Sequence, residues 1–339
     1  MSLKIEAFDA ECAFKKLNDE WKELQASSDR QVIFMTPEWQ SNWWAAYHPG
    51  ELWIIAVRDE DTGKLVGLAP WFIDHDHPKG RLVRSIGCVD VSYYLEPILR
   101  RGHEQEVLQA LAQYAAENHD RFDRLDFCNI PTESPVLTLW QPILESAGFT
   151  VTIRQQEVCP VLNLPEDFEA YLRQLDKKQR HEVRRKMRRA LGAENKTDWF
   201  YLDTQDQLQE SMNRFLRLMR ASHPEKAAFL DDPANLDFFR RVLPALAECG
   251  WLSVSMLQVD EVDAAAYLSF DYNNRIFLYN SGHDPEVHPE LSPGWVLLAF
   301  VIWDAIDRRR EAFDFLRGNE DYKYRLGGVD TPVMMLIAQ

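Results

Sequence analysis

The stretch HPELSPGWVLLAFVIW, from His288 to Trp303, predicts an apolar helix whose first turn is almost bare of side chains. Ser292 is a good N-cap residue and Pro293 suits the first helical position. Gly294 costs a helix about 1 kcal/mol relative to alanine, yet it removes a side chain where a ligand would approach. Uncovered N–H groups at the positive end of a helix dipole bind anions. Two interpretations stay open here: a structural cap, or a site for a phosphate-like group.

Strands surround this helix in the predicted order of elements. Two hairpin strands and a third strand precede it, and a strand, a short helix or turn and a closing strand follow it. The predicted segments are Trp251–Asp260, Asp263–Asn273, Arg275–Gly282, Ala312–Gly318, Glu320–Gly327 and Thr331–Gln339.

The first half of the chain shows the same order of helices, antiparallel hairpin, strand, helix and strand. Thr36 and Pro37 predict a helix start, and the Asp61–Gly63 turn joins two hairpin strands. The length of 339 residues also favours about two domains. We therefore predict two similar α/β domains, residues 1–160 and 161–339, each with a mixed, mostly antiparallel sheet flanked by helices.

Bulk properties exclude several classes of protein. The net charge of −16 disfavours binding to DNA, and no apolar run approaches the length of a membrane span. The N-terminus lacks the apolar segment of a signal peptide. The cysteines never show C-x-x-C spacing, which predicts reduced thiols in the cytoplasm and neither a zinc site nor a disulfide framework. They are Cys12, Cys88, Cys128, Cys159 and Cys249.

A basic helix breaks the acidic background. The segment Arg173–Arg189 contains nine Lys/Arg residues and two acidic residues, a local balance of +7. Like charges at i and i+4, such as Arg180 and Arg184, disfavour an isolated helix. Either acidic protein surface or a phosphate-bearing ligand should offset them, and the sequence does not decide between the two.

Two further pairs of residues are candidates for chemistry. Tyr322 and Lys323 follow a predicted strand, and the lysine is either plain surface or a cation for a developing oxyanion. His283 and Asp284 follow another strand end and form either a turn or a general base. The spacing His75-Asp76-His77 lies in a loop, and we predict no metal site.

Taken in order, the second half resembles the CelD-type branch of the GNAT acyltransferases, which is associated with cellulose and exopolysaccharide biosynthesis. The matching features are "AA" in a strand, "Y…HD", "LSPG" at a helix start, "DFLRG" on the next strand and "YK" after it, across about residues 160–325. The first half matches mainly through "TPEW…WW". The resemblance extends to the Fem-type aminoacyl ligases, and it implies two tandem GNAT-like domains, the first of them degenerate.

The resemblance also assigns roles to residues. In GNAT enzymes the loop before the helix binds the donor's pyrophosphate, which implies that role for Ser292, Pro293, Gly294 and Trp295. The "LSPG" sequence departs from the usual Q/R-x-x-G-x-G/A loop. The aromatic-lysine pair of the Fem ligases lies beside the transferred acyl group and implies catalytic roles for Tyr322 and Lys323.

Together these features predict transfer of an acyl group from acetyl-CoA or another acyl-CoA to a small amine, such as an amino sugar or a peptide. No tightly bound cofactor is expected. Arg180 and Arg184 would help hold the pyrophosphate, Lys323 would stabilise the oxyanion, and His283 or Asp284 would accept the proton. The alternatives are a Fem-like ligase that uses aminoacyl-tRNA and an inactive GNAT scaffold. The acceptor, the acyl chain length and the oligomeric state are not predicted.

Overall fold

The computed structural model describes residues 2–88, 91–192, 196–202 and 207–339. The chain forms two compact units: unit 1 is Met1–Glu157 with Thr331–Gln339, and unit 2 is Val158–Asp330. Two strands, β7 (Val151–Asn163) and β13 (Val329–Ala338), carry the chain from one unit to the other.

Unit 1 is built on a mixed sheet with the strand order β1-β2-β3-β4-β6-β13-β7. The pairs β1–β2, β2–β3, β3–β4 and β6–β13 are antiparallel, and β4–β6 is parallel. A short strand, β5, pairs with β3. The strands are β1 (Leu3–Phe8), β2 (Glu51–Asp59), β3 (Leu65–Asp74), β4 (Leu82–Ser85), β5 (Ile98–Leu99) and β6 (Arg124–Pro131), with β7 and β13.

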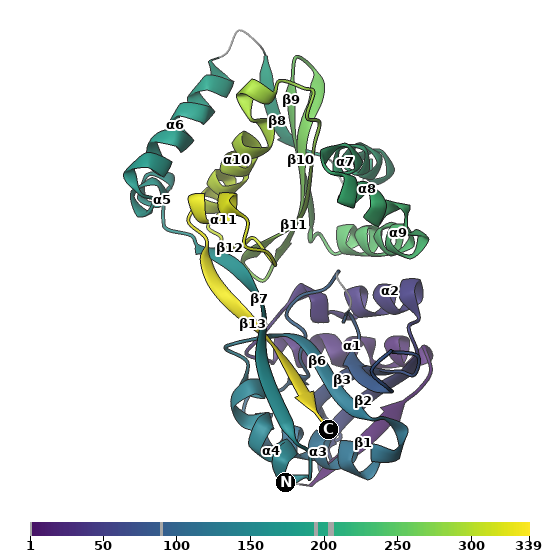
Figure 1. Cartoon of the computed structure of the whole chain (residues 1–339). Coiled ribbons are helices and arrows are strands. Elements are labelled where there is room, and N and C mark those ends of the chain that lie inside the picture. Colours follow the sequence, from purple (N-terminus) through teal and green to yellow (C-terminus); the bar gives the residue numbers. More distant parts are fainter. Residues whose placement is uncertain (1, 89–90, 193–195, 203–206) are drawn as a thin grey trace. The chain divides into compact units, whose positions relative to one another are not determined.

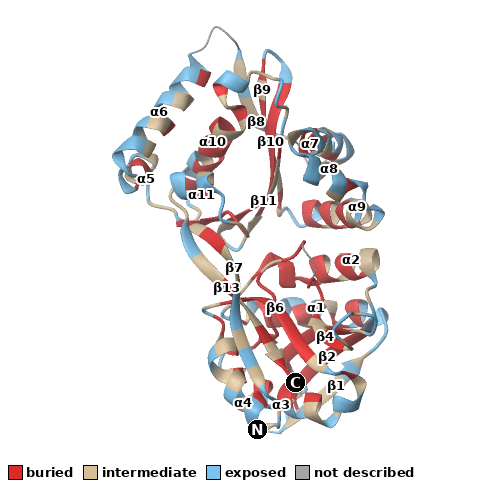
Figure 2. Ribbon diagram, in the orientation of Figure 1, coloured by how far each residue is buried: buried red, intermediate tan, exposed pale blue. Residues whose placement is uncertain are grey.

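Helices cover both faces of this sheet, so its central strands are buried throughout (Figure 2). Trp53 and Trp71 of β2 and β3 pack with Leu108 and Trp140 in a core beneath α3. Thr36 caps α2 as predicted, since its hydroxyl accepts a hydrogen bond from the Trp39 N–H at 3.2 Å. The helices are α1 (Cys12–Ala26), η1 (Ile33–Met35), α2 (Pro37–Tyr47), α3 (Glu104–Glu117), η2 (His119–Arg121), η3 (Val136–Trp140) and α4 (Gln141–Ser146).

In unit 2 the strand order continues from the end of β7 as β12-β11-β10-β9-β8. The pairs β8–β9, β9–β10, β10–β11 and β7–β12 are antiparallel, and β11–β12 is parallel. The strands are β8 (Thr197–Tyr201), β9 (Leu252–Val259), β10 (Val262–Tyr272), β11 (Arg275–His283) and β12 (Ala312–Asp314).

The helices of unit 2 lie on opposite faces of its sheet (Figure 1). The apolar helix α10 contacts β9, β10 and β11 on one face, and α7 contacts β10 and β11 on the other. Gly282 permits the approach of α7, because a Cβ there would lie 2.3 Å from the backbone N of Met219. The helices are α5 (Phe168–Gln174), α6 (Lys177–Leu191), α7 (Leu208–Ser222), α8 (Pro224–Asp231), α9 (Pro233–Glu248), η4 (Pro289–Leu291), α10 (Pro293–Asp307) and α11 (Asp321–Arg325).

The predicted fold class is confirmed: in each unit the strands pair mostly antiparallel, with one parallel pair, and helices flank them. One element lies elsewhere than expected. The sequence analysis assigned Thr331–Gln339 to the second half, whereas β13 pairs with β6, with Leu336 opposite Phe127 in unit 1. The sequence pattern correctly predicted that this segment is a strand, but it did not indicate which strand the segment pairs with.

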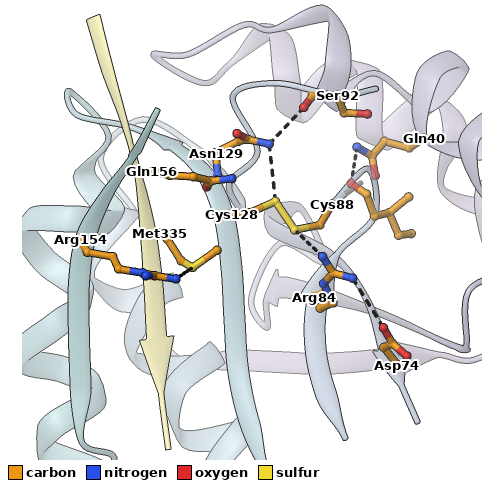
Figure 3. The surroundings of a disulfide bond; sticks show 11 residues. Gln40, Asp74, Arg84, Cys88, Ser92, Cys128, Asn129, Arg154, Gln156 and Met335 are labelled. Atoms are coloured by element: carbon orange, nitrogen blue, oxygen red, sulfur yellow. Dashed lines mark hydrogen bonds and ion pairs between the residues drawn. A yellow bond between two sulfur atoms is a disulfide. The ribbon is translucent and has the colours of Figure 1, made fainter. Parts of the chain in front are cut away.

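The expectation that all cysteines are reduced is wrong for two of them. Cys88, after β4, and Cys128, on β6, form a disulfide with Cα atoms 6.1 Å apart (Figure 3). The parallel pairing of β4 and β6 brings these residues, 40 positions apart in the sequence, into reach. No sequence-spacing motif predicts a disulfide between these two cysteines.

Candidate functional site

The start of α10 differs from a capped helix. Ser292 has left-handed backbone angles (φ 54°, ψ 58°), and its side chain caps no amide, so the predicted side-chain N-cap is wrong. Pro293 occupies the first turn as expected. The first amide-to-carbonyl bond runs from the Val296 N–H to the Ser292 oxygen at 3.1 Å. The amides of Gly294 and Trp295 precede it and have no acceptor among the residues that the structure describes.

Gly294 is not required by packing. A Cβ at this position would have one neighbour within 4 Å, the Tyr267 hydroxyl oxygen at 3.9 Å. That hydroxyl donates to the Gly294 carbonyl oxygen at 3.0 Å, and it fixes the first turn from inside the core. The outer side of the turn is therefore open to an incoming group.

A lysine that the sequence analysis did not select lies over this turn. The Lys186 Nζ on α6 donates to the Ser292 Oγ at 3.1 Å and lies 4.9 Å from the centroid of the Trp295 ring. Its ion-pair partner, Glu182, is 3.8 Å away. Burial is the main cause that lowers the pKa of Lys186. The left-handed Ser292 thus presents its hydroxyl to a half-buried cation instead of to its own helix.

The helical periodicity of α6 indicated that Lys186 lies beside the buried face of this helix. Val183 and Ala190 are the buried residues of α6. Helical periodicity places Lys186 on one flank of this stripe, and Arg180 and Arg184 on the other. The sequence analysis chose Arg180 and Arg184 because the stripe alone does not show which flank faces α10.

The two arginines expected at the pyrophosphate are used elsewhere. Arg180 donates to the carbonyl oxygens of Leu172 at 2.8 Å and Leu175 at 3.0 Å, at the end of α5. Arg184 forms an ion pair with Glu169 of α5 at 2.5 Å. Acidic and carbonyl oxygens of the protein itself therefore offset part of the basic face, as one of the two open alternatives stated.

Lys323 is buried, with 2% of its surface exposed, and its ammonium group is fully engaged. The Nζ donates to the carbonyl oxygens of Leu316 (3.1 Å), Arg317 (2.7 Å) and Gly318 (3.2 Å) and pairs with Glu320 at 2.9 Å. An ammonium has three donors. For Lys323 to reach an oxyanion, one of these contacts must be exchanged.

Tyr322 connects α11 to the start of α10. It packs against the same core as Trp295, and burial raises its pKa. Its charge in turn raises the pKa of Tyr267, the residue bonded to Gly294, although burial is the larger cause there. Tyr322 and Trp295 therefore both pack on the core of unit 2.

His283 and Asp284 lie at the end of β11. Burial and then the charge of Lys226 lower the pKa of His283. The Asp284 carboxylate accepts a hydrogen bond from the Glu286 N–H at 3.0 Å and so forms a turn. Beyond Phe277 and Asp314, β11 no longer pairs with β12. The end of β11, with His283, therefore pairs with β10 and no longer with β12.

These features make the start of α10 suited to an anion, with the half-buried Lys186 ammonium beside it and the Tyr267 hydroxyl beneath it. Residues 177–324 match the model of the acetyltransferase (GNAT) domain. That segment includes α6, α10 and α11. The GNAT part of the suspected resemblance is thereby confirmed, and it supports acyl transfer as the general activity.

Solved structures extend the likeness to the whole chain. FemX is 12% identical, with 98% of this chain and 96% of FemX covered and a TM-score of 0.68. A tandem GNAT protein from the clavulanic acid biosynthesis pathway is 12% identical, with 98% of each chain covered and a TM-score of 0.51. L-PGS from Bacillus licheniformis is 8% identical, with 94% and 90% covered and a TM-score of 0.55. These likenesses concern the fold, which is that of tandem GNAT proteins. No curated protein matches the sequence significantly.

The described residues contain neither a metal-binding cluster nor a membrane-spanning helix. No cluster of three or more His, Cys, Asp or Glu residues there could hold a metal ion. No helix in the described part of the chain has the length and apolar character to cross a bilayer.

Proposed function

We propose that the protein is an acyl-CoA-dependent N-acyltransferase of the CelD-type branch, which transfers an acetyl group to a small amine such as an amino sugar or peptide. Cell-envelope polysaccharide metabolism is the setting that this branch suggests. The observation that carries the proposal is the start of α10, where two uncapped amides lie beside the Lys186 ammonium. Amides and a cation together suit the pyrophosphate of coenzyme A.

The other residues receive roles by their position. Ser292, Pro293, Gly294 and Trp295 would form the donor loop, with Lys186 replacing Arg180 and Arg184 as the cation beside it. His283 is our first choice for taking the proton from the acceptor, since its lowered pKa keeps the imidazole neutral near pH 7. Asp284 is the second choice.

Lys323 and Tyr322 would act at the acyl end of the donor. The carbonyls bound by Lys323 belong to the turn after β12. Lys323 would therefore hold this turn and reach the oxyanion by releasing one carbonyl. The Tyr322 hydroxyl, kept protonated by burial, would be a hydrogen-bond donor there.

Calorimetry with acetyl-CoA and then with longer acyl-CoAs tests the donor site. Gly294→Asp should abolish binding, because a carboxylate would occupy the anion position, while the fold tolerates an acidic residue in the first turn of a helix. Gly294→Ala is the matched control: its Cβ fits at 3.9 Å from its nearest neighbour and should retain most of the affinity. Lys186→Met should weaken binding about 5-fold to 10-fold. Equal affinity of wild type and Gly294→Asp would refute the site.

The alternative is a Fem-like ligase that uses aminoacyl-tRNA. The likeness to the FemX fold and the exposed arginines of α6, such as Arg188 and Arg189, favour it. Binding of tRNA should then fall steeply with salt, because many phosphate contacts release counterions. A third possibility, an inactive scaffold, predicts ligand binding without turnover.

The proposed partners are an acyl-CoA and an amine, without DNA and without membrane insertion. The proposed location is the cytoplasm. The Cys88–Cys128 disulfide weighs against that location, because disulfides are rare in reducing compartments. Thiol alkylation of the protein in intact cells tests it: a modified Cys88 would support the cytoplasm, and a protected Cys88 would contradict it.

A further inference from the structure

Two lysines of unit 2, Lys323 and Lys226, differ in the contacts of their ammonium groups. Lys323 has its donors occupied and a carboxylate partner at 2.9 Å. Lys226, from α8, is half-buried and donates to the carbonyl oxygen of Ser281 and to the Ser281 Oγ at 2.9 Å. Within the described residues, no carboxylate lies in ion-pair range of Lys226, so its burial is not offset by a salt bridge.

One position on the Lys226 nitrogen is left open by these contacts. An ammonium has three N–H donors, and Ser281 takes two of them. When the third proton leaves, the lone pair takes its place and points away from Ser281. Burial lowers the pKa of Lys226 to about 8. Near pH 7.5 its neutral fraction is therefore roughly two orders of magnitude larger than that of an ordinary lysine with a pKa near 10.4.

Lys226 belongs to the same region as the candidate donor site. The last paired residues of β11 and β12 are Phe277 and Asp314, and Ser281 lies on β11 past this point. The charged groups that act on Lys226 or respond to it are Glu320, before α11, and His283, on β11. Ser281 is also the cross-strand partner of Tyr267 on β10, whose hydroxyl donates to the Gly294 carbonyl oxygen in the first turn of α10.

The helices packed against α8 are α7 and α9, and each contributes an arginine that forms an ion pair. Arg220 of α7 is 2.6 Å from Asp231, and Arg241 of α9 is 2.6 Å from Asp237. The pH response of Lys226 is therefore set mainly by its burial, with His283 and Glu320 as the titrating neighbours.

We propose that Lys226 is a self-acylation site, whose Nζ takes the acyl group from a bound acyl-CoA when no acceptor amine is present. The neutral amine attacks the thioester carbonyl, an N–C bond forms, and the C–S bond breaks. Coenzyme A leaves as the thiol, taking up the proton that the nitrogen sheds. The inference rests on the proposed function, since it needs a bound acyl donor.

Mass spectrometry of the full-length protein after incubation with acetyl-CoA alone tests the proposal. At pH 7.5, Lys226 should be acetylated at least about tenfold faster than the exposed Lys178 and Lys196, in line with its larger neutral fraction. The rate should rise with pH and level off above about pH 8. Gly294→Asp should lower the rate at Lys226 clearly below that of the wild type, because the acyl donor would no longer be bound. Lys226→Arg, which keeps the charge and the Ser281 contacts, should lose the adduct from the intact mass.

Three outcomes would contradict self-acylation at Lys226, and they distinguish its failure from failure of the proposed function. Binding of acetyl-CoA by calorimetry with acetylation of Lys226 no faster than at Lys178 would overturn this inference and leave the proposed function standing. Equal acetylation of Lys226 in wild type and Gly294→Asp would show reaction from solution and overturn it as well. If acetyl-CoA does not bind, the proposed function and the self-acylation fall together.

Discussion

Lys323 is a buried cation that holds three backbone carbonyls in the turn after β12. Lys323→Met would leave the oxygens of Leu316, Arg317 and Gly318 without their donor. We expect the free energy of unfolding to fall by about 2–4 kcal/mol, because buried acceptors without partners are costly. Urea denaturation measures it, with the exposed Lys178→Met as control. An unchanged midpoint would show that water replaces the amine without cost.

Glu23 provides a test of pH dependence. Hydrogen bonding from Arg100, at 3.1 Å, is the main cause that lowers the pKa of Glu23 from 4.5 to about 2. A carboxyl group whose pKa is lower in the folded state stabilises the protein at pH values above its unfolded-state pKa. This stabilisation is lost as the pH falls toward the folded-state pKa. The stability difference between wild type and Glu23→Gln should be constant above about pH 5 and shrink between pH 4.5 and 2. It should also be small, since Glu23 is half-exposed. A difference that does not vary with pH would disprove the linkage.

At this scale the sequence predicts residue types better than contacts. It indicated a cation beside the start of α10, but Arg180 and Arg184 bind α5, and Lys186 lies over Ser292 instead. Burial of Lys323 was likewise not visible, since its carbonyl partners come from a turn whose path depends on the whole of unit 2. Helical periodicity gives the face of a helix and not the neighbour on each flank.

At the scale of elements, α2 is held by the cap that its sequence predicts. The Thr36 hydroxyl accepts from the Trp39 N–H at 3.2 Å and donates to the Ile33 oxygen at 2.7 Å. Thr36→Ala should lower the free energy of unfolding by about 0.5–2 kcal/mol. Thr36→Ser keeps the hydroxyl and should recover most of it. Thermal denaturation of both variants measures the effect, and equal melting of Thr36→Ala and wild type would contradict the role of the cap.

The start of α10 shows where such local prediction stops. Ser292-Pro293 has the same cap signature as Thr36-Pro37, yet Ser292 is left-handed and its hydroxyl accepts from Lys186. The turn of η4 before it and the contact with α6 decide this conformation. The hairpins, by contrast, depend on adjacent residues, and β2–β3 and β9–β10 form as predicted.

At the scale of the whole molecule, β13 joins the end of the chain to unit 1. Leu336 is fully buried in the unit 1 core. Leu336→Asp should therefore destabilise unit 1 by more than about 3 kcal/mol, because it buries an unpaired charge. Hydrogen exchange should accelerate in β6, its partner strand, while β9 and β10 of unit 2 stay protected.

The half-buried neighbour Met335 supplies the control for this test, as Met335→Ala should leave exchange in β6 nearly unchanged. Equal acceleration in both units after Leu336→Asp would show that they unfold as one. The partner of β13 lay beyond the reach of the sequence, since a strand pattern indicates two faces and not which edge it joins.

The place of β13 between β6 and β7 also sets an order on synthesis. A nascent chain ordinarily folds its N-terminal domain first. Here all residues of unit 2 have been translated once Asp330 has left the ribosome, whereas the sheet of unit 1 still lacks Thr331–Gln339. Until then β6 and β7 expose unpaired edges, which invite pairing between chains. A product terminated just after Asp330 therefore contains all of unit 2, whereas its unit 1 lacks most of the strand that lies between β6 and β7.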